Sequence, residues 1–188
     1  MWYIRAMPAP TTRIRIALLT IILLAVPGMV PAQRGNEKEP APRFHAKTVD
    51  GESFTNESVK GKVVLFEFWT TWCPLCVGEA PIVDQLSKEF ADKGLIVLAV
   101  DVGESKKTVK KYLDTHPRTC RIVYMEDTNL AAMYAATVYP IYVVVDREGN
   151  IVGTQRGAGG ERALRRLAAR AGIGADEDEA SARLVTAN

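Results

Sequence analysis

The sequence predicts an α/β fold built around a mixed β-sheet. Continuous apolar runs of strand length are expected of strands buried on both faces of a sheet, and they occur at Val63–Trp69, Leu95–Val102 and Ile141–Val145. Helical stretches separate these runs, and this alternation indicates crossover connections within one sheet. After the third run the chain turns back through Gly149 and Asn150, which predicts an antiparallel edge strand.

The other elements follow from local signals. Near the start of the predicted domain, Phe44–Val49 and Ser53–Thr55 flank Asp50-Gly51, a dipeptide common in hairpin turns, so a small hairpin is expected there. A further strand begins at Cys120. Helices are expected at Pro74–Lys93, Ser105–Thr115, Asn129–Ala135 and Glu161–Ala171.

Residues 1–32 have the pattern of a secretory signal peptide. Basic residues through Arg15 precede the apolar stretch Ile16–Val26, and small residues follow at Val30–Ala32. We predict cleavage after Ala32. An uncleaved membrane anchor is the alternative, although the apolar stretch is shorter than the roughly 20 residues of a spanning helix. Either outcome places the domain outside the cytoplasm, in the periplasm or an equivalent compartment, where disulfides persist.

The rest of the chain divides into three segments. Residues 33–42 are polar and proline-rich, which is typical of a flexible linker. Residues 43–173 form the predicted domain, and the acidic residues 174–188 are expected to be a disordered tail. The net charge of +2 depends on three arginines of the signal segment, since without them 21 basic residues face 22 acidic ones. No basic cluster remains that would bind nucleic acid.

Cys73 and Cys76 carry the chemistry that the sequence suggests. A structural zinc site needs four ligands, and the chain offers only Cys120, His45 and His116 besides this pair, each isolated from the others. No metal site is therefore expected. Copper held by both thiols and one histidine is an alternative, because soft thiolates suit Cu(I). Cys120 is expected to be a small buried residue, and both histidines are expected at the surface.

The position of the two cysteines favours redox chemistry over a structural disulfide, which would stabilise little by closing so short a loop. Cys73 follows a buried strand, and Pro74 suits the first position of a helix. The Cys73 sulfur would then face free N–H groups, which stabilise a thiolate and make this residue the nucleophile. Cys76, one turn further and more buried, would be the resolving thiol. No cofactor is expected beyond a Cys73–Cys76 disulfide.

Two segments resemble a known family. GKVVLFEFWTTWCPLCVGEAP at Gly61–Pro81 and VYPIYVVVDREGNIVG at Val138–Gly153 are similar to the thioredoxin-like fold, and within it to extracytoplasmic thiol-disulfide oxidoreductases of the TlpA/ResA type. The resemblance implies a three-layer fold with helices on both faces of the sheet and an N-terminal hairpin extension. It also implies protein disulfide substrates, a membrane thiol electron donor of the DsbD/CcdA type and a link to cytochrome c biogenesis. We expect a reductant, with a disulfide oxidase and a copper-binding chaperone on the same fold as alternatives.

The resemblance also assigns substrate-binding residues. It makes Pro140 a cis-proline that faces the cysteine pair and presents the backbone of Tyr139 to an extended substrate segment. Trp72, partly exposed beside Cys73, and Pro74 complete the expected binding surface.

Two acids complete the candidate site. Glu67 lies inside an apolar strand, where burial raises the pKa of a carboxyl towards the range needed to take a proton from Cys76. Its alternative is a structural carboxylate at the sheet edge, or one paired with Lys62 or another cation. Glu79 resembles the acid that tunes the cysteines in this family. We expect it on the exposed side of the helix start, where a solvated glutamate is the alternative.

Overall fold

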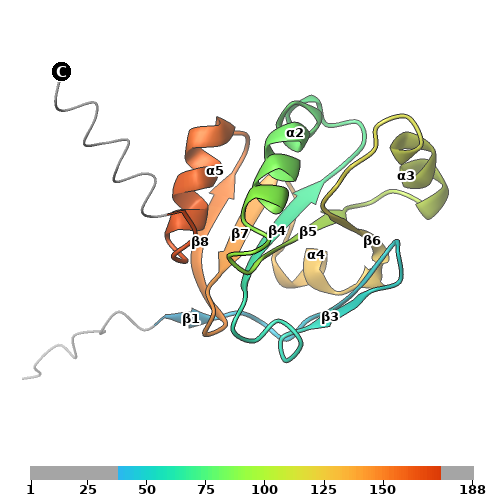
Figure 1. The fold of residues 1–188 in the computed structure, drawn as a ribbon. Helices are drawn as coiled ribbons and strands as arrows, with labels where there is room; N and C mark the ends of the chain where they lie inside the picture. Colours follow the sequence, from blue (N-terminus) through green and yellow to red (C-terminus); the bar gives the residue numbers. More distant parts are fainter. Residues whose placement is uncertain (1–37, 175–188) are drawn as a thin grey trace, which may run out of the picture. The chain divides into compact units, whose positions relative to one another are not determined.

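One mixed sheet organises residues 38–174, the part of the chain that this computed structural model describes (Figure 1). Its strands lie in the order β1-β8-β7-β4-β5-β6-β2-β3. Strands β4, β5 and β6 run parallel, and every other neighbouring pair is antiparallel. The strands are β1 (Glu39–Pro40), β2 (His45–Thr48), β3 (Ser53–Thr55), β4 (Val63–Trp69), β5 (Leu95–Asp101), β6 (Arg121–Thr128), β7 (Ile141–Val145) and β8 (Asn150–Arg156).

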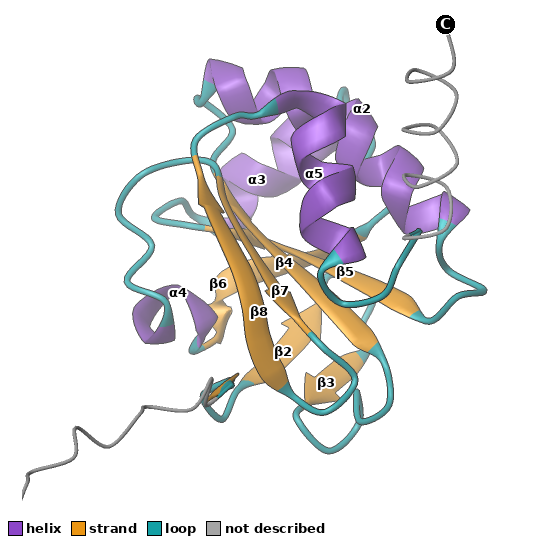
Figure 2. Ribbon diagram, turned by 90° about the vertical axis from the view of Figure 1, so that its left-hand side faces the viewer, coloured by secondary structure: helices purple, strands orange, loops and turns teal. Residues whose placement is uncertain are grey.

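Helices cover both faces of the sheet (Figure 2). They are α2 (Pro74–Glu89), α3 (Lys106–Leu113), α4 (Leu130–Met133) and α5 (Gly160–Ala169). Helices α2, α3 and α5 pack on one face, where Leu86, Val109 and Leu164 enter a common core. Helix α4 lies on the other face, where Leu130 is buried. The predicted three-layer thioredoxin-like fold is confirmed.

Strand β4 lies at the centre of the sheet and accounts for the apolar run at Val63–Trp69. All seven of its residues are buried. Leu65 and Trp69 enter the core beneath α2 and α5, whereas Phe66 and Phe68 enter the core on the opposite face. A strand buried on both faces has no position for a polar side chain, so Glu67 in its middle is the exception that needs an explanation.

The predicted hairpin is present as β2 and β3. Gly51 has φ +91°, a conformation that favours glycine, which explains why this dipeptide forms the turn. The hairpin extends the sheet through the pairing of β2 with β6. Helix α2 ends at Glu89, before its predicted end at Lys93, because the chain turns there towards Gly94, which has φ +86°.

The start of the folded region differs from the prediction. Glu39 and Pro40, assigned to the flexible linker 33–42, form β1 and pair antiparallel with β8, so β8 is not the edge strand. Lys38 also forms a 2.9 Å ion pair with Asp146. The pairing of β1 with β8 depends on backbone hydrogen bonds and on the Lys38–Asp146 ion pair, so no apolar pattern in the sequence indicates it. Proline is tolerated here because an outer strand leaves one side unpaired.

Other expectations concern segments beyond these residues. The expected signal peptide at 1–32, the first part of the linker and the acidic tail after residue 174 lie outside the described residues. Within 38–174, no helix has the length and apolar character needed to cross a membrane.

Candidate active site

Cys73 caps the N-terminus of α2. Its backbone is extended, with φ −84° and ψ 108°, and its Sγ accepts the backbone N–H of Cys76 at 3.1 Å. Pro74 occupies the first turn, where its missing N–H needs no partner. The two sulfurs are joined as a disulfide. After reduction, the Cys73 sulfur would remain at the positive end of the helix dipole, which favours a thiolate.

The rim of this site is apolar and exposed. The Trp72 side chain is 65% exposed and Leu75 is 56% exposed, which is unusual for residues of their size. The ring of Trp72 meets the ring of Tyr139 edge-on, with 6.0 Å between centroids. The Tyr139–Pro140 peptide bond is cis, as the resemblance implied. The structure therefore brings Trp72 and the segment before β7 together beside Cys73.

Glu67 is fully buried, as the sequence predicted. In the sheet it lies between its register partners Ala99 of β5 and Tyr142 of β7. Its Oε2 forms a 2.9 Å ion pair with a terminal nitrogen of Arg118, so the cation is Arg118 rather than Lys62. Its Oε1 is buried and has no hydrogen-bond partner among the described residues. Burial raises the pKa of Glu67, and the positive charge of Arg118 partly opposes this shift.

Arg118 is itself held in place. Its side chain is only 4% exposed, and its Nε donates to Asp84 of α2 at 3.1 Å. The same carboxylate accepts the backbone N–H groups of Thr119 and Cys120, which fixes the loop before β6 to α2. The guanidinium lies 5.6 Å from the ring centre of Trp69. Sequence reasoning missed Arg118, because nothing in a loop arginine indicates that it reaches a strand 51 positions away.

The position predicted for Glu79 is wrong. We expected it on the exposed side of the helix start, but it is 5% exposed. Its Oε2 accepts the hydroxyl of Tyr142 at 2.8 Å, and its Oε1 accepts the N–H groups of Gly159 and Gly160. The cause is α5, which packs against α2 and excludes water from that face. With three donors around it, Glu79 ties α2 to β7 and to the start of α5.

A second acidic pair supports the loop before Trp72. Asp101 ends β5 in register with Trp69 and is fully buried. Burial, followed by the nearby charge of Glu104, raises the pKa of Asp101 to about 8. The Glu104 carboxylate accepts both the N–H and the hydroxyl of Thr71 at 2.6 Å. An acid inside the run LIVLAVDV was a signal for this pair that sequence reasoning did not use.

The third cysteine and the histidines take no part in the Cys73–Cys76 disulfide. Cys120 is a buried free thiol, and burial raises its pKa well above the ordinary value. His45 and His116 are exposed, and the His116 ring stacks on Tyr112. Within residues 38–174, no three His, Cys, Asp or Glu side chains are grouped so that they could hold a metal ion.

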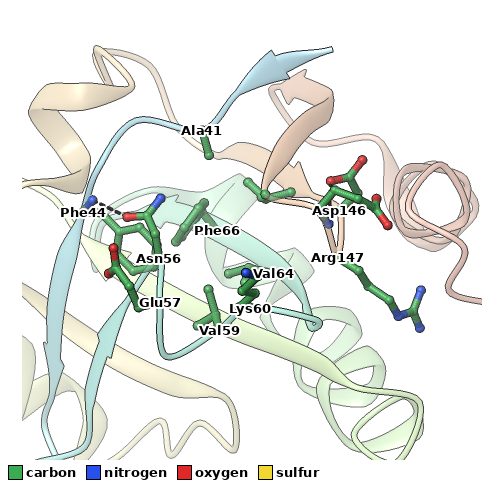
Figure 3. Close-up of a pocket in the computed structure, with 13 residues that line it drawn as sticks. Ala41, Phe44, Asn56, Glu57, Val59, Lys60, Val64, Phe66, Asp146 and Arg147 are labelled. Atoms are coloured by element: carbon green, nitrogen blue, oxygen red, sulfur yellow. Dashed lines mark hydrogen bonds between the residues drawn. The ribbon is translucent and has the colours of Figure 1, made fainter.

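A pocket of about 300 Å³ lies between the N-terminal extension and the sheet (Figure 3). Phe44, Val64 and Phe66 supply apolar walls, and all three belong to the core on the face opposite α2. One of its polar groups is already occupied, since Asn56 accepts the backbone N–H of Phe44 at 2.8 Å. None of the residues of the cysteine site lines this pocket, so we assign it no part in the redox chemistry.

Comparison with known proteins identifies the family. The Redoxin family model matches residues 36–169, which is most of the chain. The chain belongs to the Redoxin family. Within it, the chain is similar to the thioredoxin-like protein YneN of Bacillus subtilis, with 38% identity over 118 residues, 61% of this chain and 68% of the relative. It is 29% identical over 119 residues to the thiol-disulfide oxidoreductase ResA of Halalkalibacterium halodurans. The match covers 63% of this chain and 68% of that relative.

A solved structure agrees with this placement in the Redoxin family. The chain is similar to the thiol:disulfide interchange protein, a thioredoxin family protein, from Chlorobium tepidum TLS. The TM-score is 0.65 and the identity 29%, over 73% of this chain and 98% of the other. This member of the Redoxin family is thus a thioredoxin-like thiol-disulfide oxidoreductase of the TlpA/ResA type.

Proposed function

We propose that this protein is an exported reductant of protein disulfides that works through Cys73 and Cys76. The observation that carries the proposal is the cap of α2, where the Cys73 sulfur accepts the N–H of Cys76 at 3.1 Å. A sulfur in that position is stabilised as a thiolate, and the thiolate is the reactive form in disulfide exchange.

The reaction has two exchange steps. The Cys73 thiolate attacks one sulfur of the substrate disulfide, and the other substrate sulfur leaves as a thiolate and takes up a proton. Cys76 then loses its proton and attacks the Cys73 sulfur, which releases the second substrate thiolate and forms the Cys73–Cys76 disulfide. Two electrons pass from the enzyme dithiol to the substrate, so the enzyme ends oxidised.

The rim supports a protein as the substrate. Trp72 exposes a large apolar surface and contacts Tyr139, the residue before Pro140. We propose that an extended segment of the substrate lies along Tyr139 and Pro140, with Trp72 and Pro74 beside the reacting sulfur. A small disulfide would make few of these contacts.

Of the two acids, Glu67 is the better candidate to receive the proton of Cys76. Both oxygens of Glu79 already accept hydrogen bonds, from Tyr142 and from the start of α5. Oε1 of Glu67 is buried and has no hydrogen-bond partner within residues 38–174. A carboxylate with an unused lone pair accepts a proton more readily than one whose lone pairs bind donors.

The proposed location and electron source go together. A reductant outside the cytoplasm is oxidised in each cycle and needs a continuous supply of electrons. The signal-peptide pattern of residues 1–32 supports export, and a terminal anchor would keep the domain at the membrane. We propose a membrane thiol donor of the DsbD/CcdA type, on the basis of the likeness to TlpA/ResA-type proteins.

Two single-cysteine variants test the proposal. Reduced Cys76→Ser, mixed with a protein that contains an accessible disulfide such as insulin, should accumulate a mixed disulfide visible on a non-reducing gel. Cys73→Ser should trap almost none, because the remaining thiol is 1% exposed and lies inside the helix. Cys120→Ser is the matched control and should turn over like the wild type. Equal trapping by both active-site variants, or none by either, would contradict the assignment.

A further inference from the structure

We propose that Arg118 is a positioning residue that holds Oε2 of Glu67 and leaves Oε1 free to take the proton of Cys76. The inference rests on the proposed function, because it concerns the step in which Cys76 attacks the mixed disulfide. Arg118 lies in the loop before β6, outside every motif that the sequence suggested for the site.

The geometry leaves the guanidinium little freedom. One terminal nitrogen lies 2.9 Å from Glu67 Oε2, and Nε lies 3.1 Å from Asp84 Oδ1. The same terminal nitrogen lies 3.4 Å from the Cys120 sulfur. A planar group held at both ends engages one chosen oxygen of Glu67 and leaves the other open. Lysine offers a single point of charge and does not provide this arrangement.

The surroundings of Glu67 are otherwise unfavourable to a negative charge. Asp84 and Glu79 face it from α2, Tyr142 faces it from β7, and Cys120 from the segment before β6. Burial and the two acids disfavour the carboxylate, and Arg118 is the main group among the described residues that favours it. Removing the Arg118 charge would therefore raise the pKa of Glu67 further.

A protonated Glu67 would block the resolving step. In that step the S–H bond of Cys76 breaks, the proton goes to Glu67 Oε1, and the sulfur bonds to Cys73 as the substrate thiolate leaves. The proton is then released from Glu67 to solvent or to the departing thiolate. Oε1, which no group of the described chain engages, is the acceptor that this balance requires, and Arg118 holds Oε2.

The pH dependence of turnover separates this role from a structural one. The rate of insulin reduction would be followed from pH 5 to pH 9 for the wild type, Arg118→Met and Arg118→Lys. Arg118→Met should lose about tenfold or more of the rate near pH 7, because it removes an effective general base. Arg118→Lys keeps the positive charge, so its rate should lie between those of the wild type and Arg118→Met. In ¹³C-Glu-labelled protein, the titration midpoint of the Glu67 carboxyl should rise in Arg118→Met.

A double variant covers the case in which Arg118→Met does not fold. Glu67→Gln/Arg118→Met removes both members of the buried pair, and Asp84 keeps the N–H groups of Thr119 and Cys120 as donors. Its pH profile should equal that of Glu67→Gln alone, because Arg118 acts only through Glu67. A further loss of rate in the double variant would overturn the inference, and so would an unchanged profile and midpoint in a folded Arg118→Met.

The same measurements distinguish the two proposals. If the wild type reduces no insulin and Cys76→Ser traps no partner, the proposed function fails. If the wild type is active and the Arg118 variants follow its profile, only the positioning role fails.

Discussion

The hydroxyl of Tyr142 donates a 2.8 Å hydrogen bond to Oε2 of Glu79 inside the core. Both side chains are buried, and they join the strand that follows Pro140 to the helix that carries the cysteines. This bond holds the two halves of the site in register. The stability of the domain therefore depends on a contact between β7 and the helix that begins at the cysteine pair.

Tyr142→Phe should lower the free energy of unfolding by about 1–3 kcal/mol, because it leaves a buried carboxylate oxygen without its donor. Tyr134→Phe is a matched control, since the Tyr134 hydroxyl is buried and has no hydrogen-bond partner among the described residues. Removal of the Tyr134 hydroxyl should leave the free energy of unfolding unchanged or raise it. Urea unfolding of both variants measures the difference, and equal losses would show that the Tyr142 hydroxyl contributes nothing specific.

Trp72→Ala should change substrate binding while leaving stability nearly unaltered, because the side chain is 65% exposed. We expect a higher KM for insulin, since the variant loses the apolar rim beside Cys73. The rate with a small aromatic disulfide such as DTNB, which bypasses the rim, should stay within about twofold, on the order of the 0.5 kcal/mol typical of surface substitutions. A parallel loss with both substrates would point to damage at the cysteines instead.

Asp101→Asn should flatten the pH dependence of stability. The pKa of Asp101 is raised from 3.8 to about 8, so between these values the folded protein holds a proton that the unfolded chain has released. Stability therefore falls as pH rises through this window, by up to about 1.4 kcal/mol per pH unit from this group. The asparagine side chain of the variant does not titrate. Above pH 8 the variant should therefore be more stable than the wild type. Parallel urea-unfolding curves from pH 5 to pH 9 would show that Asp101 does not titrate there.

The reduction potential decides the direction of electron flow. Equilibration in dithiothreitol or glutathione buffers, read by mass after thiol labelling, gives its value. A potential near thioredoxin's, about −270 mV, is expected for a reductant. A value near about −120 mV would assign the protein as an oxidase instead.

The regular elements were accessible to sequence reasoning because their signals are local. The sequence of β4 is an apolar run because all of its residues are buried. The start of α2 is indicated by Pro74 directly after Cys73. The burial of Glu67 followed from the same run. Each of these features depends on neighbours within a few positions along the chain.

The polar contacts of the site were not accessible in this way. Glu79 and Gly160 are 81 positions apart, and Glu67 and Arg118 are 51 apart. The helical pattern of α2 does not show that α5 covers the face that carries Glu79. The sequence therefore predicts an exposed Glu79, and the structure shows a buried one. Strand β1 was missed for a related reason, since backbone pairing selects no side-chain pattern.

The link between Glu79 and the start of α5 has a consequence for the order of synthesis. The chain is made from its N-terminus, so the cysteine helix is complete long before Gly159 and Gly160 are added. Until then, the Glu79 carboxylate lacks two of its three donors. A chain that ended before α5 would contain both cysteines and most of the sheet, but the face of α2 that carries Glu79 would be open to water. Attachment of α5 is then the event that shields Glu79 from water and ties the cysteine helix to the last part of the described chain.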